Sequence, residues 1–201
     1  MLIYQKSKSN NLTSVKEKLP VFFIPSFICI NAIDFKDDNK NSLELILSLF
    51  QCNLLAIRSS AADEDGQSNS AAGEYESVLN VPSYDPEKII EAINAVIASY
   101  KKKRPLLEND EVIIQEMVQD TTMSGVIFTH DLNTGAPYYV INYDDQSGLT
   151  DTVTSGDGEY SNRTLYIHRN STNKLQSDRF VKLLQAVYHP KTSDNFLKFL
   201  I

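Results

Sequence analysis

Helical and strand-like patterns are unevenly distributed along this chain, and that distribution constrains its fold more than any other sequence feature. Apolar residues three and four positions apart predict helices at 9–19, 42–51, 85–103 and 177–188. Short runs rich in β-branched and aromatic residues, bounded by turn residues, predict strands at 54–60, 75–81, 111–118, 124–131, 137–144, 150–156 and 163–168. The pattern favours the α+β class, with a mixed first lobe at 1–117 and a mainly antiparallel second lobe at 118–201, joined near residues 117–123.

The remaining segments are harder to place in regular structure. The apolar run 21–30 is broken by Pro25, which lacks a backbone donor and predicts an edge or bent strand. Residues 34–41 are polar, and we expect a connector there. Residues 61–74 are small, polar and acidic, which predicts a loop. This loop exceeds the usual connection of about 4–6 residues, a length typical of functional loops, and a cleft between two lobes is a natural ligand site.

Composition excludes several classes of protein. Lys and Arg number 19 against 26 Asp and Glu, so the net charge is −7 and no basic footprint for nucleic acid is expected. No apolar stretch approaches the roughly 18–20 residues that cross a bilayer, which predicts a cytoplasmic protein without a membrane partner. Glycine occurs only 7 times, so any binding site built on glycine-rich loops would contain few glycines.

Arg58 ends an otherwise apolar strand and is the first candidate for a binding role. A buried guanidinium needs a partner, and a salt bridge to Asp63, Glu64 or Asp65 would supply one. Alternatively, its planar fork of donors suits phosphate oxygens, with the small residues of the following loop allowing close backbone approach. The loop lacks the Walker pattern, so the residues leave both readings open.

Two further segments carry the same ambiguity between structure and binding. Lys8 precedes the first predicted helix, where a lysine is most often solvated. Residues 115–118 read Gln-Glu-Met-Val at a strand end, which could also offer backbone groups and Met117 to an adenine ring.

Acidic residues at turns of the second half are candidates for metal binding. Their carboxylates could bind Mg2+, although Asp in turns is also ordinary turn chemistry. The residues concerned are Asp131, Asp144, Asp145 and Asp151. The three histidines show no zinc spacing, and no nucleophile elbow or Cys–His pattern supports a nucleophilic hydrolase.

Spaced motifs in a fixed order identify a resemblance. AIRSSAADEDGQSNSAAGEYESVLNV at 56–81 is followed by VIIQEMV and by SGVIFTHDLNTG at 124–135. In this order the motifs resemble the ATP-binding domain of phosphoenolpyruvate synthases and pyruvate phosphate dikinases, over about residues 5 to 170. The stretch 138–156 is most similar to synthase-like proteins encoded with surface-polysaccharide genes.

The resemblance implies an ATP-grasp fold that holds ATP and Mg2+ between two lobes. Lys8 and Arg58 match the lysine and arginine that contact phosphates, and Asp151 matches a ribose-binding glutamate. A mobile loop over the phosphates is matched by Ser70, Ala71, Ala72 and Gly73. The hinge that holds adenine is matched by Gln115, Glu116, Met117 and Val118.

The departures from the family pattern bear on activity. Where the family has G-G-K, this chain has K-S-K. The family's G-L-G-E is replaced by G-L-T-D, and its P-P-G-F by I-P-S-F. Nothing after Asp157 matches the acidic D-x-E pair for magnesium, so the second lobe is incomplete relative to the family and the metal ligands are unknown. The phosphohistidine and pyruvate-binding domains are also missing, and we expect them in cis or in trans. We therefore expect this chain alone to bind nucleotide without turnover.

Three functions remain open at this point. The resemblance implies the ATP-binding part of a phosphoenolpyruvate synthase-like phosphotransferase, which phosphorylates pyruvate through a phosphohistidine. The alternatives are a phosphotransferase with another acceptor, such as an antibiotic, and a non-catalytic remnant that serves as a binding module in surface-polysaccharide biosynthesis. The apolar final segment 191–201 would expose its surface unless it packs, and self-association is one outcome.

Overall fold

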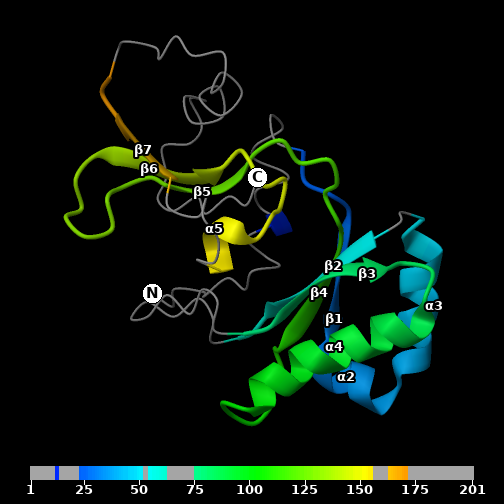
Figure 1. Ribbon diagram of the computed structural model, residues 1–201. Coiled ribbons are helices and arrows are strands. Elements are labelled where there is room, and N and C mark those ends of the chain that lie inside the picture. The colour runs from blue at the N-terminus through cyan, green and yellow to red at the C-terminus, as the bar shows by residue number, and fades with distance from the viewer. Residues whose placement is uncertain (1–11, 14–22, 52–53, 63–74, 156–162, 172–201) are drawn as a thin grey trace. The chain divides into compact units, whose positions relative to one another are not determined.

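The computed structural model describes residues 12–13, 23–51, 54–62, 75–155 and 163–171 (Figure 1). The chain divides into two compact units, Met1–Met117 and Val118–Ile201, which are described separately. The helices predicted over 9–19 and 177–188 and the loop predicted over 61–74 lie wholly or mostly outside the described residues. Within the described ranges, no helix combines the length and the apolar character needed to cross a membrane.

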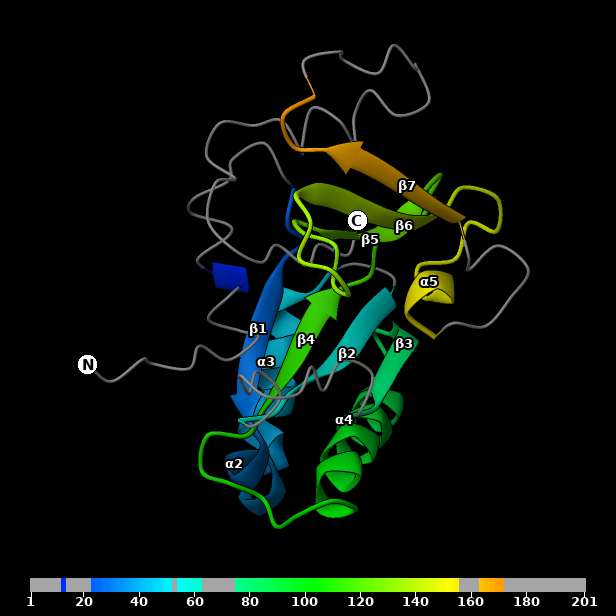
Figure 2. The same ribbon diagram turned by 90° about the vertical axis from the view of Figure 1, so that its left-hand side faces the viewer.

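Among its described residues, the first unit contains an antiparallel four-stranded sheet packed against helices. Its elements are β1 (Phe27–Asn31), α2 (Ala32–Asp37), α3 (Asn39–Leu49), β2 (Leu54–Ser60), β3 (Ser77–Pro82), α4 (Pro86–Lys101) and β4 (Glu111–Glu116). The strand order is β1-β4-β2-β3, visible from left to right in Figure 2 with the helices behind. The prediction of an edge strand in this apolar run is confirmed, since β1 lies at the edge of the described sheet and pairs there with β4.

One face of this sheet packs against the helices and forms the main core. Alternate residues along β2 and β4 face the helices, and α4 contributes the apolar stripe predicted from its sequence. The fully buried members include Leu55, Ile57, Val112, Ile114, Ile89, Ile93 and Val96. Each such side chain contributes about 1.5–3 kcal/mol through burial.

The prediction of a connector at 34–41 is wrong, because α2 and the start of α3 occupy these residues. Asn31 caps α2 by accepting from the backbone N–H groups of Ile33 and Asp34, and Asp38 caps α3 by accepting from Lys40 N–H. Ala32 and Phe35 of α2 are buried in the core. The helix is too short for its stripe to stand out among polar neighbours, and the caps and the core together stabilise it.

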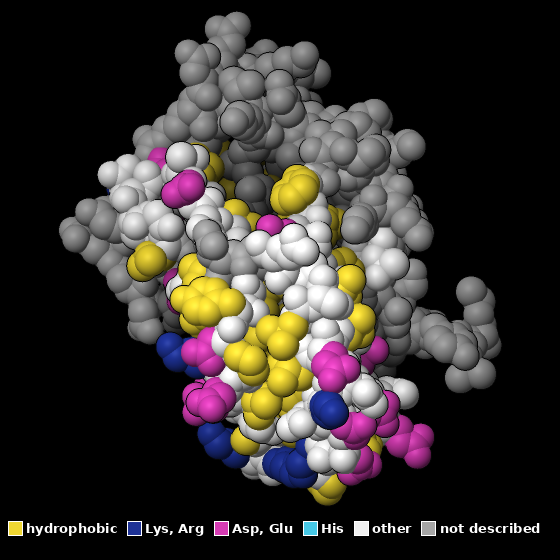
Figure 3. All heavy atoms as spheres, turned by 90° about the vertical axis from the view of Figure 1, so that its right-hand side faces the viewer, with side chains coloured by type: hydrophobic (Ala, Val, Ile, Leu, Met, Phe, Trp, Pro, Cys, Tyr) yellow, Lys and Arg dark blue, Asp and Glu magenta, His cyan; other side chains and the backbone are white. Residues whose placement is uncertain are grey.

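Apolar side chains also gather on the outer surface of the helical side of this unit (Figure 3). The large exposed ones on α3 and in the turn before α4 are Leu45, Leu47, Leu49 and Tyr84. The apolar segment on which the prediction of self-association rests, 191–201, lies outside the described residues.

In the part of the second unit that the structure describes, three antiparallel strands form a sheet in the order β5-β6-β7. Its elements are β5 (Ser124–Phe128), β6 (Tyr138–Asp144), α5 (Thr152–Ser155) and β7 (Arg163–His168). Ile127, Tyr139, Ile141 and Ile167 form its small core. The strand predicted over 150–156 is wrong. A short helix forms there instead, and the hydroxyl of its buried first residue, Thr152, donates to Asp144 at 2.8 Å.

Close approach between β5 and β6 depends on one glycine. Gly125 pairs with Tyr143, and a Cβ at Gly125 would lie 2.4 Å from the backbone oxygen of Asn142. Such a distance is shorter than any van der Waals contact, so a larger residue would push the two strands apart. The glycine of the SGVIF segment is therefore required by strand packing.

Candidate functional site

The face of the first sheet opposite the helices carries the candidate site. Arg58 of β2 pairs with Ile113 of β4, and Ala56 pairs with Gln115. Because side chains two positions apart share a face, Arg58 and Gln115 lie on the same face as diagonal neighbours on adjacent strands. Such neighbours are about 7–8 Å apart at their Cα atoms, which is close enough for one small ligand to contact both.

Arg58 is half-buried, and burial lowers the pKa of its guanidinium below the ordinary value. Within the described part of the chain, no carboxylate forms an ion pair with it and no side-chain hydrogen bond involves it. The predicted alternative partners Asp63, Glu64 and Asp65 lie outside the described residues. A partly desolvated guanidinium attracts anions more strongly than a solvated one, because the lower dielectric screens the charge less.

Gln115 is the second polar side chain on this face, and it is only 7% exposed. Across the described ranges, no hydrogen bond to its side-chain amide is found. Leaving a buried amide unsatisfied costs about 1–3 kcal/mol, and native proteins seldom tolerate it without a reason. A bound ligand that pairs with the amide would remove this cost.

The backbone at the end of β4 is largely engaged in the sheet. Glu116 N–H donates to Ser26 O at 2.9 Å, and Met117 N–H donates to Leu54 O at 3.0 Å. These two donors are therefore unavailable to a nucleobase, and an adenine at this strand end would need other groups. Val118 begins the second unit and is 47% exposed.

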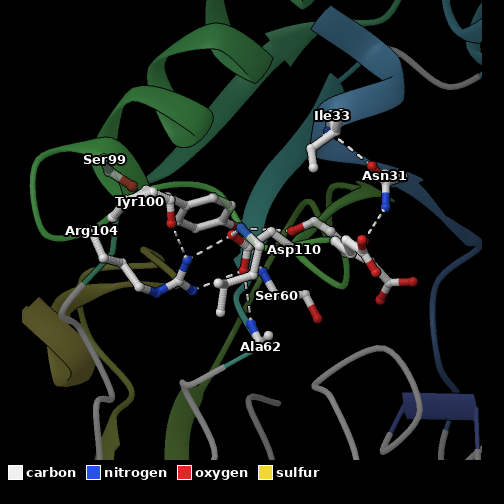
Figure 4. Close-up of polar contacts among 12 residues, drawn as sticks. Asn31, Ile33, Ser60, Ala62, Ser99, Tyr100, Arg104 and Asp110 are labelled. Carbon is white, nitrogen blue, oxygen red and sulfur yellow. Dashed lines mark hydrogen bonds and ion pairs between the residues drawn. The ribbon is translucent and has the colours of Figure 1, made fainter.

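A buried polar cluster lies at the other end of β2, and sequence reasoning missed it (Figure 4). The Tyr100 hydroxyl accepts from Ser60 N–H at 2.9 Å and donates to Glu111 O at 2.7 Å. Asp110 forms a two-bond ion pair with Arg104, at 2.7 and 2.8 Å. Asp110 also accepts from the N–H groups of Ala62 at 3.0 Å and of Leu107 at 2.8 Å. The spacing Arg104-x5-Asp110 is the only sequence signal for it.

The environment of Asp110 keeps it ionised. Its side chain is fully buried, and burial acts to raise the pKa of the carboxyl group. The hydrogen bonds from Arg104, Leu107 and Ala62, together with the charge of Arg104, outweigh burial and hold that pKa below its ordinary value. Near neutral pH the carboxylate is therefore an ionised acceptor that ties the end of β2 to the segment before β4.

Asp131 and Asp145 have hydrogen-bond or ion-pair partners within the second unit. Asp131 accepts from Asn133 N–H, Thr134 N–H and the Thr134 hydroxyl. Asp145 forms an ion pair with Arg163. Among the described residues, no group of three acidic, histidine or cysteine side chains could hold a metal ion. The turn interpretation of Asp131 is thus confirmed, and the described residues give no ligand set for Mg2+.

Asp144 is the most strongly engaged of these carboxylates and is 2% exposed. It accepts from Gln146 N–H, from the N–H and hydroxyl of Ser147, and from the Thr152 hydroxyl. Burial acts to raise the pKa of Asp144, but these hydrogen bonds outweigh burial and hold the pKa well below its ordinary range. Its oxygens organise the turn between β6 and α5.

The remaining predicted site residues are placed only in part. Lys8 and the loop of Ser70, Ala71, Ala72 and Gly73 lie outside the described residues. Asp151 is exposed and directly precedes α5. The structure therefore brings Arg58 and Gln115 together on one face and leaves the other roles as predictions.

Comparison with known proteins gives two findings. The family model of the pyruvate phosphate dikinase AMP/ATP-binding domain matches residues 29–197. The prodigiosin synthesizing transferase PigC of Serratia marcescens is 31% identical over 109 residues. That match covers 51% of this chain and 12% of the relative, so the chain spans a small part of that protein. The family match confirms the resemblance drawn from the sequence motifs.

Proposed function

Because the chain belongs to the family of the pyruvate phosphate dikinase AMP/ATP-binding domain, we propose that it binds ATP on the face of the first sheet that carries Arg58 and Gln115. The observation that carries this proposal is the pair itself. A guanidinium and a buried amide lie on one face, and neither has a side-chain partner among the described residues. The cost of two unsatisfied groups is explained if a ligand supplies the partners.

The chemistry of the two side chains fits a nucleotide. Arg58 offers a rigid fork of donors, which matches phosphate oxygens in geometry and charge. Gln115 offers one acceptor and two donors, which suit the hydrogen-bonding edge of a base or a ribose hydroxyl. We assign Arg58 to the phosphates and Gln115 to the nucleoside.

The rest of the proposed site comes from the family motifs. Lys8 would contact the phosphates together with Arg58, and Ser70, Ala71, Ala72 and Gly73 would cover them. Glu116, Met117 and Val118 would line the adenine, and Asp151 would contact the ribose. These roles assume the two-lobed ATP-grasp arrangement of the family, with ATP bound as its magnesium complex. We propose no protein ligand for the metal.

The reaction that we propose is phosphoryl transfer of the phosphoenolpyruvate synthase type. ATP would phosphorylate a histidine on a domain outside this chain, and pyruvate would then receive the phosphoryl group. Arg58 and Lys8 would position the phosphates and neutralise their charge, which dominate catalysis in this class of reaction. The relative from Serratia marcescens is named for prodigiosin synthesis, and this name favours an acceptor other than pyruvate as the second candidate.

Calorimetric titration of the chain with Mg-ATP and with adenosine tests the proposal. We expect Arg58→Ala to weaken ATP binding about tenfold to a hundredfold, because a charge-assisted hydrogen bond contributes about 1.5–3 kcal/mol. Adenosine binding should not change. Lys88→Ala is the matched control, since the Lys88 side chain is 60% exposed and its ion pair with Asp85 is long, at 4.0 Å. Absence of ATP binding by the unmutated chain would contradict the proposal.

Gln115→Met gives a second, independent readout. Methionine has a similar volume and no amide, so the ligand-free chain should gain up to about 1–3 kcal/mol in the free energy of unfolding. The same variant should bind both ATP and adenosine more weakly than the unmutated chain. A loss of stability in the ligand-free chain would mean that the Gln115 amide already has a partner, and the main observation would then fail.

A further inference from the structure

We infer that Ser99 and Tyr100, in the last turn of α4, are positioning residues for Arg58. This inference rests on the proposed function, in which Arg58 contacts phosphate. Ser99 binds the backbone of Glu76, the residue before β3. Tyr100 binds the end of β2, and the Arg104–Asp110 ion pair joins the segment after α4 to the residue before β4 (Figure 4).

Tyr100 fixes β2 to β4. Ser60 lies opposite Glu111 in the β2–β4 register, as Arg58 lies opposite Ile113. At Ser60 and Glu111 the fully buried Tyr100 hydroxyl bridges the two strands, with Ser60 N–H as donor and Glu111 O as acceptor. The position of Ser60, two residues after Arg58, therefore depends on a side chain from α4.

Ser99 fixes the start of β3 in the same way. Its hydroxyl accepts from Glu76 N–H at 3.2 Å and donates to Val96 O at 2.6 Å. Glu76 adjoins Ser77, which is the partner of Arg58 on β3. The rings of Tyr75 and Tyr100 pack edge to face with their centroids 5.0 Å apart. Such a ring pair stabilises a fold by about 0.5–1.5 kcal/mol.

The Arg104–Asp110 pair keeps this turn of α4 in place. Arg104 N–H donates to Tyr100 O at 3.1 Å, so Arg104 continues directly from the end of the helix. Its guanidinium holds Asp110, which binds Ala62 N–H at the end of β2. One polar cluster thus links α4, β2 and the start of β4.

Arg58 lies between these two anchors. Both of its strand partners, Ile113 and Ser77, are within two residues of a backbone group that the cluster binds. Contact with a phosphate requires the guanidinium to be placed within a few tenths of an ångström, and groups behind a binding residue commonly supply that precision. Removal of an anchor should therefore weaken contact with phosphate while the nucleoside contact remains.

Calorimetric titrations of the full chain with Mg-ATP and with adenosine test the inference. We expect Tyr100→Phe, which removes only the bridging hydroxyl, to weaken ATP binding about tenfold and to leave adenosine binding unchanged. Tyr84→Phe is the matched control, because Tyr84 is 77% exposed and belongs to the same unit. Ser99→Ala tests the second anchor independently and should show the same selectivity for ATP, should Tyr100→Phe prove unfolded by circular dichroism.

The outcomes separate this inference from the proposed function. Unchanged ATP affinity in both Tyr100→Phe and Ser99→Ala would overturn the inference and leave the proposed function intact. Equal losses for ATP and adenosine would also overturn it, because a purely structural role predicts them. If the unmutated chain binds neither ligand, the proposed function fails and the inference fails with it. Faster hydrogen exchange at Ser60 in Tyr100→Phe is the expected structural signature.

Discussion

Asp110→Asn should destabilise the first unit more than any other change of a single charge that the described structure suggests. The carboxylate is fully buried and accepts four hydrogen bonds, two from Arg104 and one each from Ala62 and Leu107. Both carboxylate oxygens accept from N–H groups, so the NH2 group of asparagine would face N–H donors in place of one oxygen. The partly buried Arg104 would also lose its counter-charge. Removal of one partner from a buried ion pair costs about 3–5 kcal/mol.

Urea unfolding followed by far-ultraviolet circular dichroism measures this loss. With a typical slope of about 1–3 kcal/mol per molar urea, the midpoint of the transition should fall by about 1 M or more. Glu108→Gln is the matched control, since it removes a charge from an exposed side chain two residues away. A loss below about 1 kcal/mol, or one equal to the control, would refute the argument that Asp110 organises this region.

The pH dependence of the same pair gives a second check. The pKa of Asp110 is lower in the folded chain than its ordinary value, so its contribution to stability is fully present above that ordinary value, about 3.9. The contribution is lost as the pH falls through the lower, folded-state pKa. The difference in unfolding free energy between the unmutated chain and Asp110→Asn should therefore be constant near neutral pH and shrink below about pH 4.

Two predictions concern the second unit. Gly125→Ala should lower its stability by about 1–3 kcal/mol or more in thermal unfolding, because the new Cβ would meet the Asn142 oxygen at 2.4 Å. Gly135→Asn, at φ +68° with no atom within 4 Å of the ideal Cβ, should cost less, and equal losses would contradict the packing argument. Asp144→Asn should destabilise the unit at pH 7, with the difference shrinking below about pH 4 because the folded-state pKa is lowered. A difference that does not change with pH would show that the charge is not involved.

Much of the secondary structure could be predicted because it depends on local patterns. The predicted strand at 54–60 coincides with β2, and the helical stripe after Asp85 coincides with α4 and its Pro86 start. In both segments the apolar spacing matches one buried face, so local and global preferences agree. The errors at 34–41 and 150–156 occur where a short element is stabilised by a cap or a distant carboxylate rather than by an apolar pattern.

The candidate site was predictable only in its chemistry. Arg58 stands out in the sequence because it ends an apolar strand, but nothing in the sequence pairs it with Gln115. The acidic residues of the second half attracted a metal-binding interpretation, whereas the structure shows Asp131 and Asp144 accepting hydrogen bonds within their own turns. Turn chemistry and metal binding use the same residue types, and only the geometry of donors separates them.

The sequence by itself determined the family and the mixed α+β composition, and it singled out Arg58 as a candidate binding residue. These properties follow from residue type and from spacing along the chain, which are visible without knowledge of the fold. Only the tertiary structure decided that Arg58 and Gln115 share a face, and that Tyr100 and Asp110 hold the end of β2. Strand register and the packing of α4 bring together residues far apart in the chain, and a hydrogen bond between Ser60 and Tyr100 leaves no local trace in the sequence.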